Sequence, residues 1–172
     1  DSLNNINGQI ALQNEQRLRD SVAIASAALL DSARLLKLTM DYQLNVGKAL
    51  DVIKAFHTIM EKKQYDFRAV VTDTVLYFRE LANITPYDLA RYFSTANKLD
   101  PNSFEYFEVD EPTLKFEMMD GEFGFYTFLM KYNKVDKESM QMTQNDSISV
   151  RVRMSPDFRI NAYYWNEITP IE

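Results

Sequence analysis

Acidic side chains crowd one stretch of this chain, and carboxylates at such density could hold a cation or act as a paired acid and base. Only one basic residue, Lys115, lies among them. The stretch lacks the ordered oxygen-ligand loop with a central glycine that an EF-hand requires. Strand alternation would also turn Glu105 and Glu117 toward solvent. We interpret the stretch as a solvated acidic rim, with an acidic interaction patch as the alternative; its members are Glu105, Glu108, Asp110, Glu111, Glu117, Asp120 and Glu122.

His57 is the only histidine, and the chain has no cysteine. One imidazole without a thiol or a paired carboxylate at ligand spacing makes neither a metal site nor a serine–histidine relay. We predict a packing or helix-surface role for His57. Phosphate-binding glycine loops and Gly-x-Ser-x-Gly elbows are also missing from the sequence. We therefore predict no catalytic residue, no metal and no cofactor, and an enzyme using Glu117 or Asp120 is the third functional hypothesis.

Two arginines, Arg151 and Arg153, share one face of a predicted strand because they are two residues apart. Together they could hold the acidic surface of a partner or an anionic ligand. Pairing with acidic residues on neighbouring strands of the same sheet is the simpler interpretation. Both arginines remain candidate interaction residues.

Aromatic residues fill positions 163–165 of the last predicted strand. They could stack on a ligand or line an interface. Alternation with Ile160 and Ala162 predicts that Tyr164 is buried. We therefore expect Tyr163 and Trp165 to remain available for binding.

The composition excludes some classes of function. With 172 residues, 46% of them hydrophobic, the chain can bury one substantial core and form one or two units. The net charge of −6 has the wrong sign for a protein that binds nucleic acid. The sequence contains no run of 18 apolar residues, so we predict no membrane span. The chain begins at Asp1 without a methionine, so we expect a processed or truncated product, periplasmic or extracytoplasmic, with any signal or membrane anchor outside this chain.

Apolar residues recur at helical spacing up to about Asn97. We predict a long helix, a bend or end at Gly47, and a second helix that closes near residues 61–64. The apolar face of the long helix is broader than a coiled-coil seam, which favours more than one neighbour. Its stripe is Leu18, Val22, Ala25, Leu29, Ala33, Leu36, Met40 and Leu44, of which Leu18, Val22, Leu29 and Leu36 are the candidate interaction residues.

Two further segments precede the β-rich part of the chain. Residues 67–81 carry another apolar stripe and are predicted to be helical, although their β-branched content leaves a strand as the alternative. The next segment has stronger local signals, since Thr85 can cap a helix, Pro86 suits its first position and Asp88 its first turn. We predict a helix from Pro86 to about Asn97.

The hydrophobic period changes to two from Phe104 onward, and we place the domain boundary at residues 100–103. Residues 1–99 are then a helical region and residues 100–172 a β-β-α-β-β-β module. We predict a hairpin of strands at 104–109 and 113–118, a helix at 122–133, a second strand pair at 139–143 and 148–154, and a last strand at 158–165. The predicted fold class is α+β, an N-terminal helical region followed by a small antiparallel sheet with one packed helix, as a ferredoxin-like or NTF2-like variant.

The segments 113–118, 125–130 and 148–153 resemble, in their order and pattern, the periplasmic parts of PilN, PilO and GspL. These are assembly-platform proteins of type IV pili and type II secretion systems. VirB8-like components of type IV secretion are similar to a comparable degree. The resemblance implies a non-catalytic domain that associates with itself or with neighbours.

Two main functional hypotheses follow. The first is a scaffold or assembly domain of a bacterial envelope machine, a pilus or secretion system, whose partners are proteins or further copies of itself. The alternative is an extracytoplasmic sensor or small-ligand-binding domain in which Tyr163 and Trp165 line a pocket.

Overall fold

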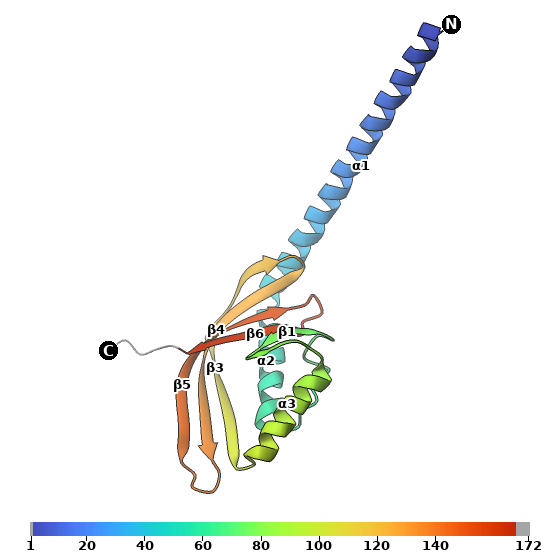
Figure 1. The fold of residues 1–172 in the computed structure, drawn as a ribbon. Coiled ribbons are helices and arrows are strands. Elements are labelled where there is room, and N and C mark those ends of the chain that lie inside the picture. The colour runs from blue at the N-terminus through green and yellow to red at the C-terminus, as the bar shows by residue number, and fades with distance from the viewer. Residues whose placement is uncertain (1, 168–172) are drawn as a thin grey trace. The chain divides into compact units, whose positions relative to one another are not determined.

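The structure is a computed structural model that describes residues 2–167 (Figure 1). Contacts within the chain define two compact units, one up to Leu38 and one from Thr39 onward. The elements are α1 (Ser2–Leu44), α2 (Val46–Glu61), β1 (Val75–Phe78), β2 (Leu81–Ile84), α3 (Pro86–Leu99), β3 (Ser103–Asp120), β4 (Phe123–Asp136), β5 (Met142–Met154) and β6 (Ile160–Glu167).

The first unit consists of helix α1 up to Leu38. The predicted long helix is confirmed, and it begins well before the apolar stripe. The interaction candidates Leu18, Val22, Leu29 and Leu36 are each more than half exposed. Among the described helices, none is both long enough and apolar enough to cross a membrane.

The second unit is built on a six-stranded sheet in the order β2-β1-β6-β5-β4-β3. The α+β class is therefore confirmed. The expected all-antiparallel sheet is wrong in one respect, because β1 pairs with β6 in parallel. Strand β1 comes from residues 67–81, where the predicted helix is wrong and the strand alternative is right.

The predicted hairpin within residues 104–118 does not form. One strand, β3, runs through both segments and pairs with β4 along its length. Its register shifts between Asp110 and Lys115, where Thr113 accepts a hydrogen bond from the Leu129 amide (2.9 Å) and donates to the Asp110 carbonyl (2.6 Å). The turn residues Asp110 to Pro112 thus make a bulge and not a chain reversal.

The predicted helix at 122–133 is also wrong, since these residues form β4. Alternate residues of β4 are buried from Gly124 to Tyr132, which is the period of a strand whose one face covers a core. Gly121, with φ of 59°, starts the two-residue turn that joins β3 to β4. Strand β5 then pairs with β4 and β6, so the predicted strand pair around Asn145 does not exist.

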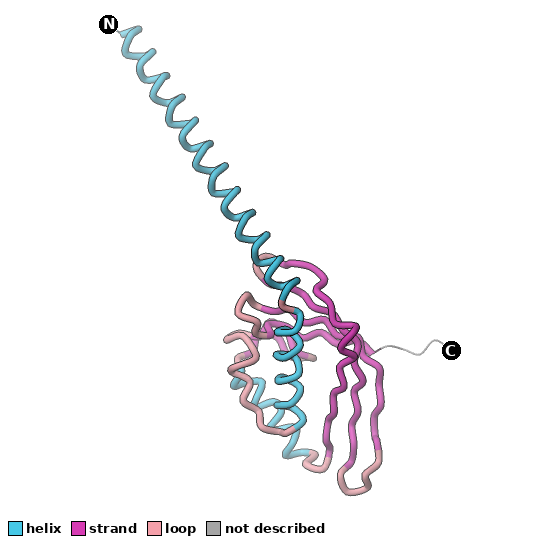
Figure 2. The backbone as a smooth tube through the Cα atoms, turned by 180° about the vertical axis from the view of Figure 1, so that it is seen from behind, coloured by secondary structure: helices cyan, strands magenta, loops and turns pink. Residues whose placement is uncertain are grey.

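Helices α2 and α3 lie on the same face of the sheet, as Figure 2 shows from behind. The ring of Phe78 in β1 is 5.6 Å from Phe56 of α2 and 5.6 Å from Phe93 of α3. The ring of Tyr163 in β6 also lies 5.6 Å from the ring of Phe78. These helices share a core with the sheet and do not form a separate region, so residues from Thr39 onward make one unit where the sequence had suggested a boundary near Asp100.

The start of α3 is fixed as predicted. Thr85 Oγ1 accepts a hydrogen bond from the Asp88 amide at 3.1 Å, and the Asp88 carboxylate accepts one from the Thr85 amide at 3.2 Å. This reciprocal cap satisfies two amides that the helix cannot pair. It fixes the first turn of the helix that later supplies one wall of a cleft.

Tyr42, near the C-terminal end of α1 and within the second unit, anchors that end to the sheet. Its hydroxyl donates to the carbonyls of Glu122 (2.8 Å) and Met154 (3.0 Å), and its own carbonyl accepts a hydrogen bond from Tyr126 (2.5 Å). The ring lies flat against Gly124, where a Cβ atom would come within 2.8 Å of it. Position 124 therefore requires glycine, because the hydrogen bonds of Tyr42 hold its ring in the space that a Cβ atom would need.

We expect Gly124→Ala to lower the free energy of unfolding by about 1–3 kcal/mol, because overpacking displaces a hydrogen-bonded ring. Denaturant unfolding measures this change. Gly47→Ala in α2 is the matched control, since nothing lies within 4 Å of its added Cβ atom. The control should be neutral or stabilising by roughly 0.5–1 kcal/mol. Equal effects of the two substitutions would contradict the role given to Tyr42.

His57 of α2 is buried in the core, 3% exposed, with its ring stacked on Phe107 at 4.6 Å. A hydrogen bond of 2.8 Å joins its Nε2 to the hydroxyl of Tyr163. Burial lowers the pKa of His57 to about 3, because the charged form would lose its hydration. The imidazole is therefore neutral in the folded protein at ordinary pH.

This burial predicts that stability falls on acidification. Below about pH 6.5 the unfolded chain takes up a proton on His57, whereas the folded protein does not. The free energy of unfolding is therefore unaffected by His57 above about pH 6.5 and falls as the pH is lowered below it. We expect a loss of about 2 kcal/mol at pH 5. Urea unfolding at pH 7 and pH 5 measures it, with His57→Gln as the control that lacks this loss. Parallel pH profiles for both proteins would refute a buried neutral His57.

Candidate functional site

Two adjoining hollows open in the second unit around one ion pair. The first, about 230 Å³, is lined most of all by α3, together with the end of α2 and the segment that follows it, and we call it the helix-side hollow. The second, about 450 Å³, is lined mainly by strands, and we call it the sheet-side hollow. Four residues line both, so the two hollows together make one cleft: Arg79, Tyr92, Glu105 and Lys134.

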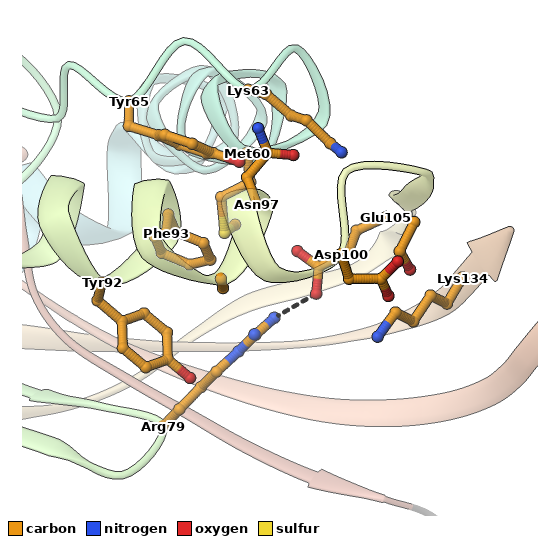
Figure 3. A pocket seen from close by; sticks show the side chains of 12 residues that line it. Met60, Lys63, Tyr65, Arg79, Tyr92, Phe93, Asn97, Asp100, Glu105 and Lys134 are labelled. Carbon is orange, nitrogen blue, oxygen red and sulfur yellow. Dashed lines mark hydrogen bonds and ion pairs between the residues drawn. The ribbon is translucent and has the colours of Figure 1, made fainter. Parts of the chain in front are cut away.

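An ion pair at the centre of the cleft joins Arg79 to Glu105 (Figure 3). Arg79 Nη2 is 3.1 Å from Glu105 Oε1, and Tyr132 donates its hydroxyl to the same oxygen at 2.6 Å. Both charged side chains are only 20% exposed. Burial is the largest single influence and lowers the pKa of Arg79, but Glu105, Tyr132 and Tyr92 together outweigh it, and the pKa of the guanidinium is raised overall. Burial and the Glu105 carboxylate raise the pKa of Tyr132.

The backbone at Arg79 is in the left-handed region, with φ of 53°. Arg79 and Glu80 form the two-residue turn between β1 and β2, a place where glycine or asparagine is usual. An arginine there costs roughly 1–2 kcal/mol in backbone strain. Interactions of the Arg79 side chain in the cleft, such as its ion pair with Glu105, must offset that cost.

Three buried side-chain atoms in the described part of the chain have no hydrogen-bond partner, and two of them belong to this cleft. They are Arg79 Nε, a donor, and Asn97 Oδ1, an acceptor, and both residues line the helix-side hollow. A buried polar atom without a partner costs about 1–3 kcal/mol. Both atoms have almost no solvent-accessible surface, so neither is open to a molecule that occupies the hollow.

Two lysines complete the charge of the cleft. Lys63 donates to the Pro101 carbonyl at 3.2 Å and lies 3.9 Å from the centre of the Phe104 ring. Burial lowers the pKa of Lys63, although Asp100 partly opposes this effect. Figure 3 shows the ammonium of Lys134 pointing into the hollow from the side opposite Arg79.

Aromatic rings form much of the wall. Tyr65 and Tyr92 line the helix-side hollow together with Phe93. In the sheet-side hollow, Trp165 packs 4.9 Å from Tyr132, and the Arg79 guanidinium lies 4.6 Å from its ring. Flat rings beside charged groups suit a planar molecule that has a polar end.

The structure brings only one predicted interaction residue, Trp165, to the cleft. Tyr163 is 1% exposed and bonded to His57, so its expected availability is wrong. Tyr164, which was expected to be buried, is only half-buried, and its ring stacks on that of Tyr77 with 4.8 Å between the ring centres. Ile160 and Ala162 are buried as predicted, but Tyr163 is buried as well, because Phe56 of α2 packs against its ring at 5.4 Å.

Arg151 and Arg153 lie on β5 away from the cleft. Arg151 pairs with Glu117 at 3.0 Å and Arg153 with Asp120 at 3.1 Å, both on β3. This is the pairing within the sheet that the sequence favoured. A role of these arginines toward a partner stays a prediction, as does that of Leu18, Val22, Leu29 and Leu36.

The acidic stretch has no common role in the structure. Glu105 is not part of a solvated rim, because it points into the cleft and binds Arg79. Glu111 pairs with Lys54, and other members pair with the arginines of β5. Within residues 2–167, no three acidic or histidine side chains come together as a possible metal site.

Sequence reasoning missed Arg79, Tyr92, Asn97 and Lys134. None of them belongs to a recognised motif, and Arg79 was assigned to a helix. One local signal was available, since Arg79-Glu80 separates two short runs of strand-forming residues and could have marked a hairpin.

Comparison with known proteins supports the fold but assigns no family. No family model matches the sequence, and no curated protein matches it. Aln2 from a Streptomyces species is 9% identical, with a TM-score of 0.54 over 69% of this chain and 86% of its own. ActVI-ORFA from Streptomyces coelicolor is 9% identical, with a TM-score of 0.55 over 70% and 95%. Naphthalene 1,2-dioxygenase with indole in its active site is 11% identical, with a TM-score of 0.52 over 77% and 81%.

Identities this low show the fold alone, and the fold is the NTF2-like variant of the α+β class. The resemblance to PilN, PilO, GspL and VirB8-like proteins is therefore wrong, because none of these compared structures is an assembly-platform or secretion component. The predicted scaffold function in a pilus or secretion machine is therefore wrong as well. The prediction of a non-enzyme is overturned too, since the fold occurs in a dioxygenase.

The central ion pair should stabilise the protein more than a surface pair of the same length. We expect a double-mutant cycle with Arg79→Gln and Glu105→Gln to give a coupling energy of about 1–2 kcal/mol. The same cycle on Arg151 and Glu117 is the matched control, at 3.0 Å but with side chains 40% and 38% exposed. That pair should give roughly 0.5 kcal/mol or less. Equal coupling energies would mean that the cleft does not shield its ion pair from solvent.

Proposed function

We propose that this protein binds a small, planar aromatic molecule in the cleft around Arg79 and Glu105. One observation carries the proposal: two adjoining hollows share the partly buried Arg79–Glu105 ion pair and have the rings of Tyr92 and Trp165 in their lining. A hollow that combines aromatic rings with a few convergent polar groups is typical of a small-molecule site. The ligand-binding alternative of the sequence analysis is thus preferred, at a site that shares only Trp165 with the one predicted.

The walls of the cleft support the aromatic character of the ligand. Tyr92 on α3 and Trp165 on β6 both line the sheet-side hollow, one supplied by a helix and the other by the sheet. An aromatic ligand that contacts both rings gains apolar burial and ring packing without disturbing the ion pair. The backbone strain at Arg79 supports the same site, because strained residues persist where function requires them.

Trp165 is the only tryptophan, so its fluorescence reports directly on the cleft. We expect at least one member of a panel of single-ring aromatics (benzoate, benzamide and benzylamine) to change this fluorescence saturably and to raise the melting temperature.

Tyr92→Ala should weaken that binding at least about fivefold by removing a wall. Tyr87→Ala on the same helix is the control, because Tyr87 is exposed and does not line the cleft. The proposal fails if no panel member binds, or if Tyr92→Ala and Tyr87→Ala behave alike.

A second candidate function is acid–base catalysis on the bound molecule. Glu105 uses one oxygen, Oε1, to accept from both Arg79 and Tyr132, and its Oε2 has no hydrogen bond to the described residues. A carboxylate held in this way can take a proton from the ligand at a fixed place. Exchange of an acidic ligand hydrogen for deuterium, followed by NMR, would support this function if Glu105→Gln abolished it while ligand binding persisted.

A further inference from the structure

The apolar stripe of helix α1 is exposed throughout the first unit, from Leu18 to Leu36. Its large side chains, Leu18, Val22, Leu29 and Leu36, are each more than half exposed. A single helix gains little stability in water by itself, because most helical stability in proteins comes from packing an apolar face. Apolar side chains that are exposed in a continuous row mark a surface that binds another protein. The stripe is therefore a contact surface.

The spacing of the stripe limits the helices that can cover it. Leu18 lies eleven residues before Leu29, and Ala25 lies eleven residues before Leu36. An eleven-residue repeat has about 3.67 residues per turn, close to the value of about 3.6 in a straight helix. Two helices with this repeat can lie side by side over roughly 27 Å, the length from Leu18 to Leu36, with little supercoiling. A helix with a seven-residue repeat would drift off the stripe, because the two periods differ.

From this period we infer that the stripe binds the same stripe of a second copy of the chain, so that the protein dimerises through its first unit. A second copy has the matching eleven-residue repeat. The area is also sufficient. The four large side chains bury about 100 Å² each and the smaller residues beside them add about half as much again, so two copies remove about 1,200 Å² from water. A specific interface needs about 1,000 to 1,200 Å².

The residues that border the stripe permit close approach of a second copy. On one side of it lie Ser21, Ala28 and Ser32, which are small and uncharged. Helix axes approach most closely where the side chains at the contact are small, and no charge has to lose its hydration there. Residues 2–38 carry four basic and three acidic side chains, so two copies of this unit repel each other little, although the whole chain has a net charge of −6.

The molar mass of the full chain in solution tests this inference. We expect light scattering at roughly 100 μM protein to give twice the mass of one chain, because interfaces of this area have dissociation constants in the micromolar range or below. Sedimentation of a dilution series then gives the dissociation constant. Leu29→Asp should raise that constant at least about a hundredfold, since it places two like charges at the centre of an apolar contact.

Leu30→Asp is the matched control. Leu30 is 73% exposed and Leu29 is 72% exposed, but Leu30 lies about 100° further round the helix and outside the stripe. Both substitutions replace leucine by aspartate in the same turn, so they change the intrinsic helix propensity equally. Leu30→Asp should change the dissociation constant by no more than about twofold. The fluorescence of Trp165, in β6 of the second unit, should be the same in all three proteins and so verify their folding.

Selective loss of the dimer in Leu29→Asp supports the inference. A chain that keeps the mass of a monomer at roughly 100 μM would overturn it, because a second copy would then not cover the stripe. Equal weakening by Leu29→Asp and Leu30→Asp would also overturn it, since the general hydrophobicity of the helix would then hold the copies together. A dimer that survives both substitutions would have its interface elsewhere on the chain. None of these outcomes depends on ligand binding in the cleft.

Discussion

Phe78 contacts one ring from each of the two helices that pack on the sheet, and the cleft depends on this contact. Phe56 holds α2 against it and Phe93 holds α3. Arg79 is the next residue, so the burial of Phe78 determines where the guanidinium can reach. The left-handed backbone at Arg79 then reverses the chain into β2. The apolar core thus positions the central charge of the site.

Partial burial gives this charge a different role from the arginines of the outer sheet. Arg79 and Arg151 make ion pairs of nearly the same length, but the first pair is half as exposed as the second. Solvent screens the second pair, while the first lies in a medium where electrostatic interactions are stronger and unpaired atoms are costly. A polar group of a ligand that binds beside this pair therefore gains more than the same group would at the surface.

The fold alone does not specify the ligand, because chains that are only about one-tenth identical share it. Function must be argued from the residues that line the site. Here these are an arginine in a left-handed turn, the glutamate that pairs with it, two lysines and aromatic rings from α3 and β6. Their combination distinguishes this site from a generic hollow under a curved sheet.

The sequence by itself determined the features that depend on neighbours along the chain. The long helix, the second helix and the capped start of α3 were all predicted, because helical periodicity and the Thr85 cap act within a few residues. The strands around Ile148 to Met154 and Ile160 to Trp165 were also located, since alternation is local.

Only the tertiary structure decided which segments pair and which faces are buried. Residues 123–136 form a strand because β3 and β5 provide hydrogen-bonding edges on both sides, and Tyr163 is buried because α2 covers that face. Glu105 meets Arg79 across 26 residues of sequence, a contact that no local pattern encodes. The spacing of residues in the sequence therefore could not predict the candidate site. Its residues come from helices, several strands and a turn, and only the packing of the core brings these together.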